Sequence, residues 1–167
     1  VISVQNIKEY WNDDFIAFAI GCSFSFEEAL LNAGLEIDHI TNNKVVPMYR
    51  TNIKNKKSGP FKSEMVVSMR IFNQKDINKV KQVSGNFSFA HGDPIHIGNP
   101  VEIGINNILS PDWGDSPRKK NDDEEYIFWA CGVTPQNAII EAKIPFCITH
   151  TPGHMLITDI SENSLHS

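Results

Sequence analysis

The chain has 167 residues, 41% of them hydrophobic, so it is long enough to bury the core of one ordinary domain. Fifteen basic and twenty acidic side chains give a net charge of −5, and no basic stripe is present, which argues against nucleic acid as a partner. The longest apolar stretch, residues 15–20, is too short to cross a bilayer, so no membrane association is expected.

Three cysteines bear on the compartment. Cys22, Cys131 and Cys147 cannot all pair within one chain, and each lies in an apolar context that suits a reduced thiol. We therefore expect a reducing compartment, which is the cytoplasm or, in a eukaryote, the mitochondrial matrix. Val1 is not an initiator methionine, so we expect the sequence to be an excerpt of a longer chain.

Two helices are predicted in the first part of the chain. Apolar residues recur at helical spacing over residues 7–18 and predict an amphipathic helix that ends near Gly21. A second helix follows, because Ser25 and Glu28 have the spacing of a capping box. Gly34 is suited to a left-handed C-terminal cap of this second helix.

The middle of the chain predicts strands and one helix. Residues 44–50 and 64–72 are rich in Val, Met and Ile and predict strands, and Asn73 can cap a helix that follows. Single Gly and Pro residues interrupt every apolar run over residues 84–113, which allows only short elements there. We expect residues 44–113 to form an inserted α+β subdomain.

The last part of the chain predicts a strand, a helix and a strand. The strands are residues 126–131 and 146–149, and Thr134 followed by proline marks the start of the helix between them. So short a crossover favours a parallel pair. We therefore expect an α/β fold, a small parallel or mixed sheet flanked by helices, built from residues 1–43 and 114–167.

A ligand site is predicted where these two strands end. The carboxyl ends of parallel strands meet at one edge, where open α/β sheets bind ligands. That edge would hold Cys131, Gly132, Thr134, His150 and Thr151. Two predicted helix N-termini point the same way and suit a small anionic substrate, an amino acid or another carboxylate. Ordinary capping is the alternative explanation for either helix end taken singly.

Histidines gather in loops beside glycine and proline. His150 and His154 flank a Thr-Pro-Gly turn, which prevents the continuous helix of a zinc-binding pair, so no metal is expected. His91 and His96 lie in a second such loop, where substrate-binding, acid–base and turn residues look alike. Each histidine taken alone could be structural, although a loop histidine has less packing reason to exist.

Four further side chains are candidates, and three of them have two interpretations. Cys22 precedes a helix and Cys131 ends a strand, so each is a nucleophile or a small buried apolar residue. Arg50, near Asn52, could grip a carboxylate through two N–H groups or be a surface residue. Glu27 is free for acid–base work because the neighbouring glutamate has the capping position.

Six ordered motifs resemble one family. They are GCSFSFEEAL at residues 21–30, PMYRTN at 47–52, MVVSMR at 65–70, HGDPIHIG at 91–98, WACGVTPQ at 129–136 and ITHTPGHM at 148–155. The chain resembles the "putative hydro-lyase" family of mostly bacterial proteins that includes mitochondrial D-glutamate cyclase. The resemblance implies an α/β core with an inserted α+β unit, no cofactor, and an N-terminal region rich in Gly, Pro and Asn before this sequence begins.

The resemblance also implies a reaction, the dehydration of D-glutamate to 5-oxo-D-proline by a carbon–oxygen hydro-lyase. The α-amine attacks the γ-carboxyl carbon and water leaves, so the site needs a base, an acid and oxyanion donors. His150 and His154 suit the proton transfers, and the amides after Gly132 or Cys22 suit the oxyanion. Arg50 could hold the α-carboxylate. The substrate-binding residues expected are Ser23, Arg50, Asn52, His91, His96, Gly132, Thr134 and Thr151.

Two alternatives remain open at this point. One is a non-catalytic domain that binds an amino acid or carboxylate through the same helix ends. The other is a hydro-lyase that acts on another small acid by eliminating water across a carbon–carbon bond. A homo-oligomer is compatible with the sequence in each case.

Overall fold

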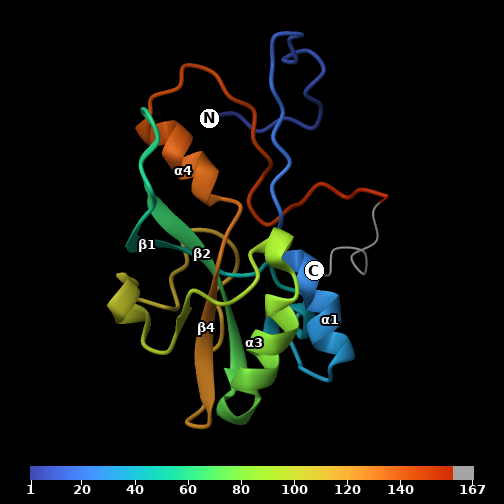
Figure 1. Cartoon of the computed structure of the whole chain (residues 1–167), viewed down its shortest axis with the longest axis vertical. Coiled ribbons are helices and arrows are strands. Elements are labelled where there is room, and N and C mark those ends of the chain that lie inside the picture. Colours follow the sequence, from blue (N-terminus) through green and yellow to red (C-terminus); the bar gives the residue numbers. More distant parts are fainter. Residues whose placement is uncertain (160–167) are drawn as a thin grey trace.

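The computed structural model describes residues 1–159 and contains one four-stranded sheet, in which every pair of neighbouring strands is antiparallel. The strands are β1 (Met48–Lys54), β2 (Glu64–Asn73), β3 (His96–Ile97) and β4 (Glu124–Ala130), and their order is β1-β2-β4-β3. The two long strands, β2 and β4, form the centre of the sheet (Figure 1). Their register runs from Val67 opposite Ala130 to Asn73 opposite Glu124.

The predicted parallel or mixed sheet flanked by helices is wrong. Residues 146–149 form no strand, so the expected parallel partner does not exist. Lys143 has a left-handed backbone conformation, with φ of 53°, and Pro145 cannot donate a ladder hydrogen bond, so the chain turns away after the last helix. Both edges of β4 are also taken, by β2 on one side and β3 on the other.

Two helices cover one face of the sheet. The α-helices are α1 (Glu27–Asn32), α2 (Asp38–Thr41), α3 (Ile77–Gly85) and α4 (Thr134–Glu141), and the 3₁₀ turns are η1 (Ser23–Phe26), η2 (Gln74–Asp76), η3 (Ser88–Ala90) and η4 (Pro100–Ile103). Helices α1 and α3 lie side by side on this face, whereas α4 lies past the end of the sheet where β4 finishes (Figure 1). None of the helices within residues 1–159 has the length and hydropathy needed to cross a bilayer.

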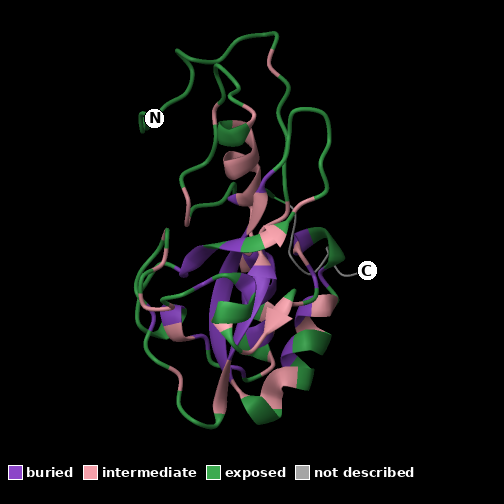
Figure 2. Cartoon of the chain, turned by 90° about the vertical axis from the view of Figure 1, so that its left-hand side faces the viewer, coloured by how far each residue is buried: buried purple, intermediate pink, exposed green. Residues whose placement is uncertain are grey.

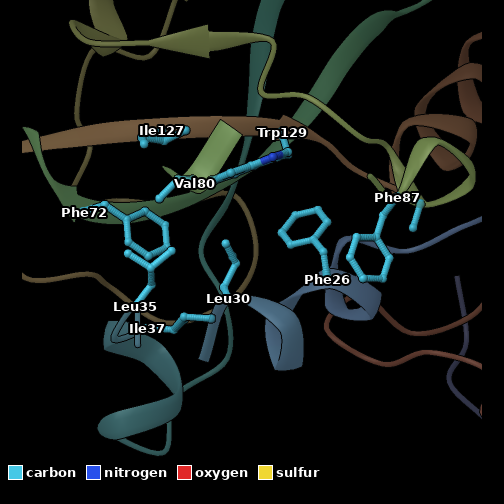
Figure 3. Packing of buried hydrophobic residues seen from close by; sticks show 10 residues of the cluster. Phe26, Leu30, Leu35, Ile37, Phe72, Val80, Phe87, Ile127 and Trp129 are labelled. Atoms are coloured by element: carbon cyan, nitrogen blue, oxygen red, sulfur yellow. The ribbon is translucent and has the colours of Figure 1, made fainter. Parts of the chain in front are cut away.

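The side-chain alternation of β2 divides the core into two faces. Ser68, Arg70 and Phe72 face α1 and α3, whereas Val67, Met69 and Ile71 pack on the opposite face. Val66 packs in a third cluster, with Val46, Met48 and Val133. On the helix side, Phe26, Leu30 and Val80 pack around Trp129 (Figure 3). Phe26 and Trp129 contact each other with ring centroids 5.3 Å apart. Ser68 and Arg70 are thus polar residues inside an apolar layer.

Several local predictions are confirmed. The strand expected at residues 64–72 is β2, and that expected at 126–131 is β4. The Asn73 side chain accepts from the Lys75 amide at 3.2 Å and starts the 3₁₀ turn that leads into α3. Gly34 has φ of 76° and ends α1, and the Leu35 amide donates to the Leu30 carbonyl, as a left-handed C-terminal cap requires.

Other local predictions are wrong. The capping box does not form, since the side chain of Ser25 is buried within η1 and makes no cap hydrogen bond to α1. The helix predicted over residues 7–18 is replaced by isolated turns, in which the Asn12 side chain accepts from the Asp14 amide at 3.2 Å. Such short-range side-chain bonds compete with helix formation.

The residues before η1 and those between α4 and residue 159 lie together at one end of the described structure. The Phe15 ring contacts the Phe146 ring at 5.7 Å, and most of the surrounding residues are exposed (Figure 2). The division into residues 1–43 and 114–167 around an insertion at 44–113 stays a prediction, and residues 160–167 of it lie outside the described part of the chain.

Candidate functional site

The turn before α1 is packed tightly against a second loop. A Cβ atom added to Gly21 would lie 1.8 Å from the Phe89 carbonyl oxygen, so only glycine fits there. Cys22 follows with an extended backbone, φ −126° and ψ 141°, and the Ser25 amide then closes the first turn of η1 on its carbonyl. The close contact at Gly21 brings η3 and the residues after it to the start of η1.

His91 follows η3 and faces this turn. Its backbone is left-handed, with φ of 77°, a conformation uncommon for residues other than glycine. The ring makes a hydrogen bond with the Gly21 backbone, and its Nε2 atom is buried with no hydrogen-bond partner among residues 1–159. Burial, followed by the positive charge of Arg70, lowers the pKa of His91, so the ring is neutral at pH 7.

The end of β4 lies between the Gly21 turn and the loop that follows α4 and contains His150, here called the C-terminal loop. A Cβ atom added to Gly132 would lie 3.9 Å from His150 Cε1 and 4.0 Å from the Gly21 carbonyl oxygen. Gln136 of α4 holds this loop by donating to the His150 carbonyl at 3.0 Å. The His150 ring is exposed, yet partial desolvation and then the nearby His154 lower its pKa.

We define the candidate site as Gly21, Cys22, His91, Cys131, Gly132 and His150. Four segments that are far apart in sequence supply these residues. His91 and Gly132 lie against Gly21, and His150 lies against Gly132. The site joins two imidazoles of lowered pKa with two thiols, at the end of the sheet from which α4 starts. A neutral imidazole at pH 7 is a competent proton acceptor.

The Cys131 thiol is held in its protonated form. Burial raises its pKa to about 11, and a hydrogen bond from the Val133 amide and the charge of Arg70 offset this only in part. A thiol that stays protonated at pH 7 is a poor nucleophile. The geometry therefore favours packing over covalent catalysis for Cys131.

We expect Cys131 to react slowly with iodoacetamide at pH 7.5, because alkylation requires the thiolate. Cys147 is exposed and serves as the internal reference in the same sample. Mass spectrometry of peptides should show Cys147 modified first and Cys131 modified at an appreciable rate only as the pH approaches about 11. Equal labelling of the two thiols at pH 7.5 would contradict this assignment.

A buried polar cluster borders the site at Ser23, the residue after Cys22, and consists of Ser23, Glu27, Ser68 and Arg70. Arg70 of β2, 2% exposed, donates from Nε to Glu27 Oε1 at 2.8 Å and from Nη2 to the same oxygen. Its Nη2 also donates to Ser23 Oγ and its Nη1 to Ser68 Oγ, each at 3.1 Å. The two serine hydroxyls are 3.2 Å apart. Four of the five guanidinium N–H groups are thus used.

The surroundings of the cluster explain its protonation. Burial alone would raise the pKa of Glu27, but the charge of Arg70 and contact with His39 outweigh it, so the pKa is lowered and the carboxylate is charged. His39 Nε2 lies 3.1 Å from Glu27 Oε1, at ion-pair distance but off hydrogen-bond geometry. The guanidinium also lies over the rings of Phe26 and Trp129, at 5.1 and 5.3 Å.

Arg70, Ser68 and His39 were missed by the sequence reasoning. A signal for the first was present, since an arginine inside the apolar strand MVVSMRIF must have a buried partner or an unusual role. Glu27 is a predicted acid–base candidate, and in the structure its carboxylate pairs with Arg70; the acid–base role stays a prediction. Ser23 belongs to the same cluster rather than to an open surface. No pattern in the sequence pointed to His39.

The other predicted substrate-binding residues lie outside the contacts of the candidate site. Arg50 is half exposed, pairs with Asp112 at 2.7 Å and stacks on Trp113. Asn52 is exposed beside Gly104, and the His96 ring bonds the Asn99 carbonyl. Their roles stay predictions, but the positive charge of Arg50 is already balanced by a carboxylate.

Three predicted site residues, at the start of α4 and in the C-terminal loop, make hydrogen bonds or contacts with nearby backbone groups. The Thr134 hydroxyl does not cap α4; it accepts from the Val66 amide at 3.0 Å and donates to the Val66 carbonyl at 3.1 Å. The Thr151 carbonyl accepts from the His154 amide, and the His154 ring contacts the Pro152 carbonyl at 3.3 Å. Among residues 1–159, no three acidic, His or Cys side chains gather in a way that could hold a metal ion.

These features define an α+β protein with an antiparallel sheet, in which His91 lies against the Gly21 turn, His150 lies beside Gly132, and a buried arginine of the central strand bonds to Ser23. The chain belongs to the D-glutamate cyclase family, whose sequence profile matches residues 16–159. The family resemblance carried by the six motifs is thereby confirmed.

Three relatives illustrate the match, and each carries the name "putative hydro-lyase". The protein of Pelagibacter ubique is 51% identical over 160 residues, covering 96% of this chain and 61% of the relative. That of Dinoroseobacter shibae is 50% identical over 162 residues (97% and 54%), and that of Burkholderia ambifaria 49% over 162 residues (97% and 63%). The chain thus spans between 54% and 63% of the length of these relatives.

Proposed function

We propose that this protein is a hydro-lyase that converts D-glutamate into 5-oxo-D-proline and water. The observation that carries the proposal is that His91 lies against Gly21 and His150 against Gly132, which itself borders Gly21, in a member of the D-glutamate cyclase family. Both histidines have a lowered pKa. The reaction moves protons and forms one C–N bond while one C–O bond breaks. It needs proton-transfer groups more than it needs a nucleophile.

The first chemical requirement is a neutral amine. The α-ammonium group of D-glutamate must lose a proton before its nitrogen can attack the γ-carboxyl carbon. His91 is suited to take this proton, because its ring is neutral and its buried Nε2 atom lacks a partner within the described residues. A substrate N–H bound there would satisfy that nitrogen.

The second requirement is a leaving water molecule. After ring closure, the γ-carbon carries two oxygens and one must leave with a proton. His150 is exposed, borders Gly132 and can exchange protons with solvent, so it suits the acid role in this step. His91 lies against Gly21 and His150 against Gly132, on different loops, which lets one act on the amine and the other on the leaving oxygen.

The third requirement is a donor for the developing oxyanion. On the β4 side, the amides of Val133 and Thr134 already bond to Cys131. This leaves the first amides of η1, from Ser23 onward, as the better source of backbone donors, because the first amides of a helical turn lack internal acceptors.

Incubation of the full-length protein with D-glutamate tests the proposal. We expect loss of D-glutamate to match formation of 5-oxo-D-proline one to one, with no added cofactor. Chiral chromatography measures both compounds. L-Glutamate is the control for substrate handedness. Binding of D-glutamate by calorimetry without product would show a binding domain instead, and turnover only in a broader screen of acids would show a different hydro-lyase.

A further inference from the structure

Arg70 is an unusual residue for the position it holds. It lies in the middle of β2, on the face that packs against α1 and α3, and its side chain is 1% exposed. A buried ion pair is a weak source of stability, because a well-packed apolar pair of the same volume often does as well. The three partners of Arg70 suggest what else it does.

The guanidinium links the sheet to the turn that carries Cys22. Glu27 neutralises its charge from α1, Ser68 belongs to the same strand, and Ser23 is the first residue of η1. The two serine hydroxyls also bond to each other at 3.2 Å. The turn is therefore bonded at Ser23 to Arg70 of the sheet, and at Gly21 it packs closely against the Phe89 carbonyl.

We propose that Arg70 is a positioning residue of the candidate site, which acts through Ser23 to fix the Gly21–Ser23 turn and, with it, the loop that presents His91. This inference rests on the proposed function for its catalytic consequence. The planar guanidinium suits the task, because its fork of N–H groups reaches Glu27, Ser23 and Ser68 at once, which a lysine ammonium cannot do.

The charge of Arg70 acts on the same site through space. It contributes to the lowered pKa of His91, after burial, and it partly offsets the raised pKa of Cys131. One buried cation thus borders both the η1 side and the β4 side of the site. A lysine at this position keeps the positive charge but loses the planar set of N–H donors, so the effect of the charge can be separated from that of the hydrogen bonds.

Ser23→Ala is the sharpest test, because it leaves the Arg70–Glu27 pair intact and removes only the link to the turn. Its matched control is Ser84→Ala, another buried serine of the same core, whose Oγ accepts from Trp129 Nε1 at 3.3 Å. We expect kcat with D-glutamate to fall roughly 10-fold to 100-fold for Ser23→Ala, with KM changed by less than about threefold. Ser84→Ala should keep kcat at a similar loss of Tm.

Arg70→Lys supplies the second arm. It should lower kcat by about 100-fold, and the double variant with Ser23→Ala should be no worse than Arg70→Lys alone, because both changes remove the same link. Independent effects that multiply would overturn the proposal. So would a kcat loss in Ser84→Ala as large as that in Ser23→Ala.

Hydrogen exchange in the absence of substrate separates this inference from the proposed function. The amides of residues 21–24 should exchange faster in Ser23→Ala and Arg70→Lys than in Ser84→Ala. If the unaltered protein does not turn over D-glutamate but the exchange pattern appears, the proposed function fails and the positioning role stands. Unchanged exchange at residues 21–24 in both variants would overturn the positioning role.

Discussion

Arg70→Ala is expected to destabilise the protein by roughly 3–5 kcal/mol, because it leaves the Glu27 carboxylate buried without its partner. Glu27 is only 8% exposed, so water cannot replace the lost N–H donors without opening the core. Urea unfolding followed by circular dichroism measures the change, with the slope of the transition compared to confirm that the same surface is exposed.

Arg118→Ala is the matched control for this stability prediction. Like Arg70, Arg118 forms carboxylate ion pairs, in this case with Glu124 and Asp38, but its side chain is 39% exposed. We expect it to cost no more than about 1 kcal/mol, since water replaces the lost contacts. A second variant, Arg70→Met with Glu27→Met, should recover much of the stability lost in Arg70→Ala. Equal costs for Arg70→Ala and Arg118→Ala would contradict the assignment of a buried pair.

The same pair sets an acid limit to stability. Because the pKa of Glu27 is lowered in the folded protein, the unfolded chain binds its proton more readily. The contribution of the pair is therefore fully present above the unfolded value of 4.5 and is lost as the pH falls through the lowered folded pKa. The urea series repeated at acidic pH shows this loss directly.

His150→Ala is expected to lower kcat with D-glutamate by roughly 10² to 10⁴-fold, the usual contribution of a general acid or base. The ring is exposed, so the variant should unfold at the same temperature as the unaltered protein. Turnover is measured by the release of 5-oxoproline, and folding by a thermal scan of the same preparation. Unchanged turnover would remove His150 from the mechanism.

His154→Ala distinguishes the two neighbouring histidines. The positive charge of His154 contributes, after desolvation, to the lowered pKa of His150, so its removal should raise that pKa. Because the acid role requires the protonated His150 ring, kcat/KM should fall as the pH rises through this pKa, and this limb should move to higher pH in His154→Ala. A kcat loss as large as that of His150→Ala would instead place His154 among the proton-transfer groups.

The candidate site was predicted in part for a reason that the structure overturned. Cys131, Gly132 and His150 were placed together because two parallel strands would end at one edge, yet there is no second strand. The three residues still meet, because Gln136 of α4 holds the C-terminal loop against the end of β4. A loop that is fastened by one side chain can reach the same place as a strand, and sequence periodicity carries no information about such a contact.

Features that depend on neighbours along the chain can be predicted from the sequence. The apolar run of β2, the Asn73 cap, the left-handed Gly34 and the proline in the first turn of α4 all follow from local backbone and side-chain preferences. The family was also readable, because six motifs in a fixed order identify it without any knowledge of their contacts.

Strand pairing and the burial of charges depend on the complete fold. Strand direction depends on where the chain returns, and residues 146–149 lost their predicted strand because a left-handed residue and a proline turn the chain away. The pairing of Arg70 with Glu27, 43 residues apart, depends on the packing of α1 over β2. Burial sets the pKa of His91 and Cys131, and burial is a property of the whole fold rather than of any segment.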